Sequence, residues 1–225
     1  MFAARKCERT LVDMDLHAIE RPVLEYFRSK RITLFYSLFH ITNSTRIVDL
    51  GGTLFFWELA EQSGFPTAKV TIVNRDKPRT AVPGYAEWLI GDARNVNCAD
   101  NAFDIVFSNS LIEHLGSWGG QARLAAEIQR LAPRHFVQTP SRDFPVEPHF
   151  LTPFVHWMPK AIRASILRNF TVWGLITRPS KQQCAALAEE IRLLSKKDMA
   201  RLFPHSDLKI EKCFGLPKSI IAVKA

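Results

Sequence analysis

The stretch that most restricts the fold is residues 46–57, Arg-Ile-Val-Asp-Leu-Gly-Gly-Thr-Leu-Phe-Phe-Trp. A short apolar and β-branched run is cut off by Gly51-Gly52, a pattern typical of a buried strand followed by a tight turn. Glycine tolerates positive φ and, because it has no Cβ, lets a ligand approach the backbone. A helix predicted from Leu54 directs its unbonded N–H groups at the same place. Asp49 is therefore a candidate to orient the turn or to accept hydrogen bonds from a nucleotide-type cofactor.

This pattern alone also fits a plain structural turn. The three-glycine dinucleotide fingerprint is not met, because Leu54 and Phe55 stand where a further glycine is expected. The interpretation therefore depends on the segments that lie downstream of the turn in the chain.

Further short apolar segments alternate with helical patterns after the turn. Strands are predicted at residues 69–73, 87–90, 102–107 and 135–139, and helices at 54–63, 119–131, 159–169, 182–194 and a short segment after the Ser195/Asp198 capping pair. Strand–helix alternation predicts an α/β fold with a parallel sheet and right-handed crossovers. Residues 207–214 and 219–223 flank a Gly-Leu-Pro-Lys turn and predict a C-terminal antiparallel hairpin.

Polar residues follow three of these strands, at the edge where open α/β sheets bind ligands. Asn74, in Asn74-Arg75-Asp76, stands where an acidic side chain usually accepts from a ribose, and Asp76 is an alternative, as is a plain turn. Asp92, before Ala93, suits an adenine edge or an N-cap. The next strand ends in the small polar residues Ser108, Asn109 and Ser110, where the chemistry of such a sheet is expected.

Two histidines are candidate general bases. His114 follows the strand end at the switch region, and His149 lies in the proline-rich segment 140–159, which we interpret as an acceptor-side wall or lid. The structural alternatives stay open: His114 as a helix-face residue that shapes a pocket, and His149 or His156 as packed histidines.

Composition excludes several classes of protein. The chain has 225 residues, 47% of them apolar, and a net charge of +8. No run approaches the roughly 20 apolar residues of a membrane span, and the N-terminus lacks the apolar core of a secretory signal. Four scattered cysteines, and the absence of zinc-ligand spacing, predict free thiols, no metal and a cytoplasmic location. Despite the basic balance, no dense basic run occurs, which disfavours a nucleic-acid partner.

The domain organisation follows from the absence of repeats and linkers. We expect a single domain over residues 1–225, in which residues 1–45 form an N-terminal helical cap and residues 140–170 an acceptor-side lid. In the cap, Pro22 is expected near a helix start, and the Phe-rich stripe of residues 32–39 is expected to be core.

The motifs in order resemble the class I S-adenosylmethionine-dependent methyltransferases, in particular the small-molecule subgroup called type 11. The matching segments are residues 48–53, 70–74, 90–93 and 103–115, together with the terminal hairpin. The resemblance implies a Rossmann-like, mostly parallel sheet of seven strands with helices on both faces. It implies S-adenosyl-L-methionine as cofactor, with Gly51, Gly52 and Thr53 at its methionine part. It places Asn74 at the ribose, Asp92 and Ala93 at the adenine, and Ser108 and Asn109 near the acceptor.

The implied reaction is methyl transfer from the sulfonium to an oxygen, nitrogen or carbon atom of a small-molecule acceptor. Two departures from the family pattern, Leu54 in the turn and Asn74 in place of a carboxylate, motivate an alternative: a non-catalytic nucleotide-binding or scaffold protein. A nicotinamide-dependent oxidoreductase is disfavoured by the incomplete glycine fingerprint and by the terminal hairpin.

Overall fold

The computed structural model describes residues 11–225, with side chains from Glu25 onward. The chain forms two compact units. The larger, called here the sheet unit, comprises residues 29–145 and 189–225; the smaller unit comprises, among the described residues, 11–28 and 146–188. The first ten residues of the predicted cap lie outside the described part, and the cap, the lid and the single-domain organisation stay predictions.

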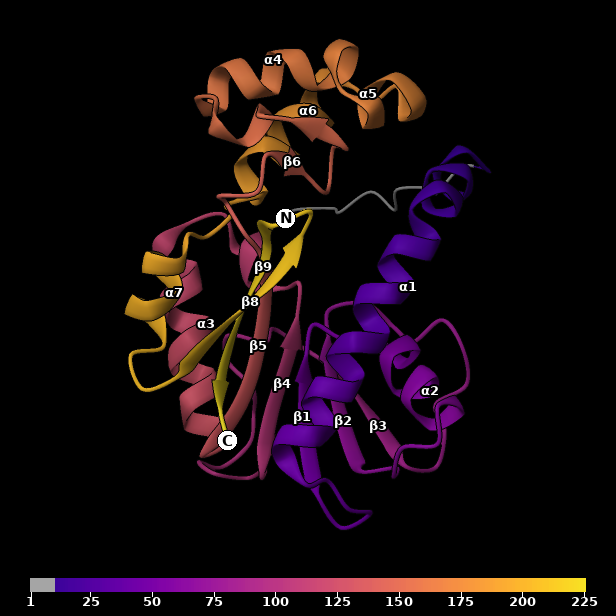
Figure 1. The fold of residues 1–225 in the computed structure, drawn as a ribbon, viewed down its shortest axis with the longest axis vertical. Helices are drawn as coiled ribbons and strands as arrows, with labels where there is room; N and C mark the ends of the chain where they lie inside the picture. Colours follow the sequence, from indigo (N-terminus) through magenta and orange to yellow (C-terminus); the bar gives the residue numbers. More distant parts are fainter. Residues whose placement is uncertain (1–10) are drawn as a thin grey trace. The chain divides into compact units, whose positions relative to one another are not determined.

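A seven-stranded sheet forms the centre of the sheet unit (Figure 1). Its strand order is β3-β2-β1-β4-β5-β9-β8. The strands are β1 (Arg46–Leu50), β2 (Lys69–Asn74), β3 (Ala86–Ile90), β4 (Ile105–Asn109), β5 (Arg134–Pro140), β8 (Asp207–Cys213) and β9 (Leu216–Lys224). The first five pair in parallel, and β9 pairs antiparallel with both β5 and β8. The predicted fold class, including the C-terminal hairpin, is confirmed.

The strand order creates the switch point of the sheet. β1 pairs with β2 on one side and with β4 on the other, so the chain moves outward from β1 in one direction and then crosses over to the other. In open α/β sheets the crevice at such a reversal, beyond the carboxyl ends of the strands, is the place where ligands bind.

Helices cover both faces of the sheet (Figure 1). One core packs α3 (Trp118–Leu131) and α7 (Lys196–Leu202) against one face. The other packs the end of α1 (Leu11–Phe39) and α2 (Leu54–Gln62) against the opposite face. Neighbouring residues of β1 divide between the two: Ile47 belongs to the second core and Val48 to the first, as the alternation of a strand requires.

Phe35 is the centre of the second core. It is fully buried, and its ring lies 5.0 Å from that of Phe107, 5.5 Å from that of Phe136 and 6.1 Å from that of Trp57. These are favourable edge-on arrangements. Phe35 therefore fastens α1 to β4, β5 and α2, as expected for the Phe-rich stripe.

The smaller unit contains elements that the sequence analysis partly missed. The proline-rich segment forms a two-stranded hairpin, β6 (Val146–Glu147) and β7 (Thr152–Pro153), and the 3-10 turn η2 (Val155–Trp157). Three helices follow: α4 (Lys160–Phe170), α5 (Val172–Thr177) and α6 (Lys181–Glu190). The short α5 was not predicted, although Thr171 caps it by accepting a hydrogen bond from the Gly174 N–H.

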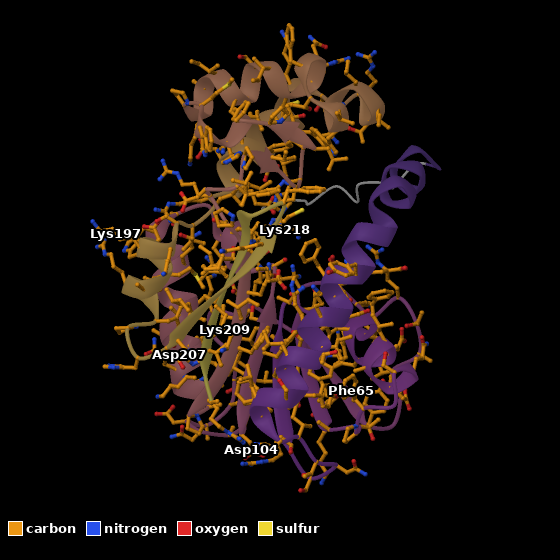
Figure 2. The ribbon with its side chains drawn as sticks, in the orientation of Figure 1. Phe65, Asp104, Lys197, Asp207, Lys209 and Lys218 are labelled. Carbon is orange, nitrogen blue, oxygen red and sulfur yellow. The ribbon has the colours of Figure 1, made fainter. Side chains whose placement is uncertain are left out.

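Several predicted boundaries were wrong; β9, for example, begins at Leu216 and not at Ser219. The cap has one continuous helix, α1, that runs through Pro22. β4 begins at Ile105, because the Asp104 carboxylate accepts from the backbone N–H and guanidinium of Arg46 at the amino-end edge of the sheet (Figure 2). α6 ends at Glu190, because residues 191–194 leave the helix and Leu194 forms a parallel bridge with Ser141.

We expect Phe35→Ala to lower the free energy of unfolding by about 3–5 kcal/mol, since it leaves a cavity among several aromatic rings. Chemical denaturation measures this. Phe214→Ala is the control, because Phe214 is fully exposed and its replacement is expected to change stability by less than about 0.5 kcal/mol. Equal effects of the two substitutions would contradict a core centred on Phe35.

Candidate functional site

The predicted cofactor residues meet along one edge of the sheet unit. They lie at or directly after the carboxyl ends of β1, β2, β3 and β4, which are consecutive neighbours in the sheet. Backbone hydrogen bonds join the turns to each other: the Gly51 N–H donates to Val73 O at 2.8 Å, and the Gly91 N–H donates to Asn74 O at 2.9 Å. The loops that the sequence marked separately therefore form one continuous rim.

Asp49 is the buried acid under the glycine turn. Trp57 Nε1, from α2, donates to Asp49 Oδ2 at 2.9 Å, whereas Oδ1 has no hydrogen-bond partner among the described residues. Burial raises the pKa of Asp49 to about 7, against the smaller opposing effect of the Trp57 hydrogen bond. The carboxyl group therefore holds its proton far more readily than an exposed aspartate does.

Gly52 is in contact with this carboxyl group. A Cβ at position 52 would lie 1.8 Å from Asp49 Oδ2, far inside van der Waals contact. The φ angle of Gly52 is not in the positive range. The contact with Asp49, and not the backbone conformation, therefore excludes a side chain at position 52. Gly51 differs: its φ is 78°, and a Cβ on it would also meet the Leu111 side chain at 2.7 Å.

The first turn of α2 faces the same rim. Thr53 is the N-cap residue, in extended conformation, and its side chain makes no capping hydrogen bond. The N–H groups at the start of this helix are thus not capped by that hydroxyl, and a helix N-terminus of this kind attracts negatively charged ligand groups.

Asn74 joins two turns. Its Nδ2 donates to Gly52 O at 2.8 Å, and its Oδ1 accepts from the Asp76 N–H at 3.1 Å. The side chain therefore holds the glycine turn against the end of β2. Its amide oxygen keeps a second lone pair that can accept from a ligand.

Asp92 lies between two arginines at the end of β3. Arg94 contacts both carboxylate oxygens, and Arg75 Nη2 lies 2.8 Å from Oδ2. Hydrogen bonds from Arg94, reinforced by those from Arg75, hold the pKa of Asp92 well below its usual range. Asp92 is therefore ionised at neutral pH. Its ion pair with Arg75 holds the Arg75 guanidinium at the end of β3. Ala93, next in the chain, is buried.

The end of β4 is held by a residue that sequence reasoning missed. Ser108 is buried and donates to Leu50 O, while Asn109 Oδ1 accepts from Arg31 Nη1 at 3.1 Å. Arg31, on α1, also donates to both carboxylate oxygens of Glu211, at 2.8 and 2.7 Å. Arg31 and Glu211 lie far apart in the sequence, so no local pattern marks this part-buried ion pair.

The 3-10 turn η1 (Ile112–Leu115) carries an acid and a histidine beyond the end of β4. Glu113 is fully buried, and its Oε2 accepts from Thr139 Oγ1 at 2.9 Å. His114 Nδ1 lies 3.0 Å from Glu190 Oε1. A carboxylate at this distance fixes the ring orientation and tautomer of a histidine.

His149 lies in the smaller unit, where it contacts a different carboxylate. Its Nδ1 is 2.6 Å from Oε1 of Glu147, a fully buried residue whose Oε2 accepts from the Phe150 N–H. This arrangement anchors the β6–β7 turn. The catalytic role of His149 stays a prediction, as does that of His114.

Comparison with known proteins agrees with this architecture. Residues 58–134 match the family model described as a methyltransferase domain. Among solved structures, the Burkholderia thailandensis 1,6-didemethyltoxoflavin-N1-methyltransferase, bound to 1,6-didemethyltoxoflavin and S-adenosylhomocysteine, superposes with a TM-score of 0.53 at 11% identity. The match covers 97% of this chain and 91% of that one. The chain has a methyltransferase fold.

Two further structures extend the comparison. Haemonchus contortus phosphoethanolamine N-methyltransferase 2, in complex with S-adenosyl-L-methionine, gives a TM-score of 0.52 at 14% identity over 81% of this chain and 38% of that one. A Rhodobacter sphaeroides protein assigned to the Zn-dependent alcohol dehydrogenases gives 0.56 at 14% identity over 86% and 88%. No curated protein matches the sequence. The resemblance to the class I methyltransferases is confirmed, and at these identities it concerns the fold.

We expect the unfolding free energy of Asp49→Asn, relative to that of the unchanged protein, to rise as the pH increases from about 4 to 7. In this range the Asp49 carboxyl of the unfolded chain ionises while the folded one, with a pKa of about 7, stays protonated, so ionisation favours unfolding. Above about pH 7 the difference levels off.

Asp104→Asn is the control with the opposite sign. Hydrogen bonds from Arg46 lower the pKa of Asp104, so this carboxylate stabilises the fold above its unfolded pKa and loses that effect as the pH falls. Denaturation of the three proteins across the pH range measures both trends, and parallel curves for the two variants would contradict the buried-acid assignment.

Proposed function

We propose that this chain is an S-adenosyl-L-methionine-dependent methyltransferase that acts on a small-molecule acceptor. The observation that carries the proposal is the continuous rim at the switch point, where the glycine turn after β1 and polar side chains after β2, β3 and β4 meet. It is supported by the methyltransferase-domain match and by the shared fold. Cofactors that carry adenosine bind at this edge of open α/β sheets.

The residues of the rim fit the proposed cofactor. The bare backbone of Gly51 and Gly52, with Thr53 and the start of α2, provides N–H groups for its methionine carboxylate. Asp49 Oδ1 is a buried acceptor that no described residue occupies, as a site for a bound amino group requires. For the rest of the cofactor, the proposed contacts are Asn74 and Arg75 at the ribose and Asp92 and Ala93 at the adenine. Ser108 and Asn109 are proposed to lie near the acceptor.

The bound cofactor supplies an electrophilic methyl group. The role of the protein is to align this group with the acceptor atom and to exclude water, and such orientation lowers a barrier by on the order of 7–11 kcal/mol. The part-buried Arg31–Glu211 pair contributes by fixing Asn109 at the end of β4. Arg31 is thus a positioning residue.

His114 is the proposed general base. With Glu190 accepting from Nδ1–H, the lone pair of the ring lies on Nε2, the nitrogen that takes a proton from an acceptor hydroxyl or amine. His149, paired with Glu147, is the second candidate.

A second candidate function, a non-catalytic nucleotide-binding or scaffold protein, is favoured by one observation. Arg75 and Arg94 already engage the Asp92 carboxylate, so an adenine amino group has to compete with two guanidinium groups. The two candidates differ in affinity for S-adenosyl-L-methionine and in turnover, and both quantities are measurable.

Isothermal titration with S-adenosyl-L-methionine and with S-adenosylhomocysteine is expected to give one site per chain. Asn74→Ala is expected to weaken binding about tenfold, because it releases the glycine turn and removes a ribose acceptor. Asn97→Ala, an exposed asparagine after β3, is the control and leaves the affinity unchanged. The absence of heat with either ligand at millimolar concentration would favour the scaffold.

Transfer of a labelled methyl group to a protein-free small-molecule extract tests the base. His114→Ala is expected to lower turnover about 10²–10⁴-fold without weakening cofactor binding. His205→Ala, an exposed histidine of the sheet unit, is the matched control. Glu190→Gln is expected to lower turnover less, because the amide oxygen can still accept from Nδ1–H and keep the ring in its orientation. Full activity of His114→Ala at every pH would remove His114 from the role.

A further inference from the structure

Exposed apolar side chains are concentrated in the smaller unit. Of the thirteen large apolar residues that are exposed in the described part of the chain, eight fall within residues 146–175. They are Val146, Phe154, Trp157, Met158, Ile162, Phe170, Val172 and Leu175, with Phe170 72% exposed. Contiguous exposed apolar surface of this kind marks a site of interaction.

Short contacts join several of these residues into one surface. The rings of Phe154 and Trp157 lie 5.2 Å apart, and Met158 follows Trp157 directly. Val146 pairs across the β6–β7 hairpin with Pro153, the neighbour of Phe154. At the other strand end the Val172 N–H donates to Thr152 Oγ1 at 3.1 Å, which brings the start of α5 to the same hairpin. We call the set Val146, Phe154, Trp157, Met158 and Val172, together with Phe170, which lies two residues before Val172 in the chain, the apolar patch.

The patch rests on a rigid base. Phe150 and Val155 are buried, the rings of Phe150 and Trp173 lie 5.9 Å apart, and the Trp173 N–H donates to Phe150 O. Phe154 has φ 63°, a conformation that a bulky residue adopts only at a cost. A strained backbone conformation of this kind persists only where the surrounding structure imposes it, and such residues are common at ligand-binding and active sites. Here it accompanies an aromatic ring that is half exposed.

The exposed charges of this segment all have one sign. Residues 146–188, all of them described, contain five lysines and arginines and a single acid, Glu147, which is fully buried. Arg163 is buried and donates to Ala188 O. The cations that remain on the surface are Lys160, Arg168, Arg178 and Lys181. Two of them, Arg168 and Lys181, line a groove of about 450 Å³ between α4 and α6, together with Ser165 and Asn169.

We propose that the smaller unit binds the surface of an anionic lipid bilayer. The apolar patch enters the interfacial region, and the four surface cations contact lipid phosphates, with the Arg168–Lys181 groove as a headgroup site. Amphipathic surfaces that combine Trp, Phe and Leu with Lys and Arg bind membranes in this way, and anionic lipids attract the basic component. Within residues 11–225, no helix is long and apolar enough to span a bilayer.

Charge favours a lipid surface over the other possible occupants. An interface between two copies of the chain through residues 146–188 would place their exposed cations against identical ones, and like charges repel. A bilayer with anionic headgroups complements both the apolar and the basic component. Self-association and capture of free phosphate are therefore the alternatives that the experiment has to separate from bilayer binding.

The test is flotation of the protein with vesicles of phosphatidylcholine, alone or mixed with phosphatidylglycerol. We expect partition into the mixed vesicles that falls with added salt, and little partition into phosphatidylcholine alone. The double variant Trp157→Ser/Phe170→Ser is expected to lose about tenfold or more in partition. Phe214→Ser is the matched control, since Phe214 is fully exposed in the β8–β9 turn of the sheet unit.

A second pair of variants tests the basic component. Arg168→Glu/Lys181→Glu is expected to abolish binding to mixed vesicles, whereas Lys196→Glu/Lys197→Glu, which reverses two exposed lysines of α7, is expected to retain it; Figure 2 shows Lys197 on α7, pointing outward. Circular dichroism establishes that each variant is folded. The proposal does not rest on the methyltransferase assignment, because flotation requires neither cofactor nor acceptor.

Three results would overturn the proposal. The first is the absence of partition into mixed vesicles, and the second is equal partition of the unchanged protein and both sets of smaller-unit variants. The third is a concentration-dependent dimer, seen by sedimentation and removed by Trp157→Ser/Phe170→Ser, that replaces vesicle binding. Titration with inorganic phosphate distinguishes a free anion from a lipid headgroup as the ligand of the groove. Binding of phosphate without partition into vesicles would assign the groove to a free anion and contradict a bilayer site.

Discussion

The contact between the Asp49 carboxyl group and the backbone of Gly52 shapes the edge on which the candidate site is built. A Cβ at position 52 would lie 1.8 Å from Asp49 Oδ2, so the turn can follow this path only if residue 52 is glycine. The same oxygen accepts from Trp57 Nε1, which ties α2 to β1. One buried carboxyl group therefore sets the path of the turn and the position of the helix that follows it.

The rest of the rim depends on this corner through hydrogen bonds. Asn74 Nδ2 binds Gly52 O, and the Gly51 N–H binds Val73 O, so the turn after β1 is joined to the end of β2. On the other side, Ser108 binds Leu50 O and Arg31 fixes Asn109. Burial of Asp49 disfavours its charged form, so the carboxyl group has a desolvation cost in the folded state. A neutral residue at this position would not have that cost. A costly buried acid with a raised pKa is typical of functional sites.

Much of this architecture could be predicted from the sequence because it arises from local pattern. The strand and glycine turn around Asp49, the capping box of Ser195 and Asp198, and the terminal hairpin are each encoded within short stretches of the chain. The interpretation of the Phe-rich stripe as core was confirmed at Phe35 for the same reason, since apolar periodicity marks a buried face.

The features that the sequence did not reveal depend on partners that are distant along the chain. Arg31 reads as one basic residue among many, and only the fold brings it to Glu211 and Asn109. The end of α6 was misplaced because its apolar spacing continues through Leu194, while the tertiary bridge from Leu194 to Ser141 ends the helix earlier. The ion pairs of Asp92 with Arg75 and Arg94 likewise require knowledge of how two loops meet.

The most direct test of the central claim is a double-mutant cycle on the free energy of unfolding at positions 49 and 52. Gly52→Ala is expected to cost about 3 kcal/mol or more in the unchanged protein, because the methyl group collides with the Asp49 carboxyl. In the Asp49→Ala background the same substitution is expected to cost less than about 0.5 kcal/mol, since the colliding atoms are gone. Equal costs in the two backgrounds would show that Asp49 does not impose glycine at position 52, and would contradict the account.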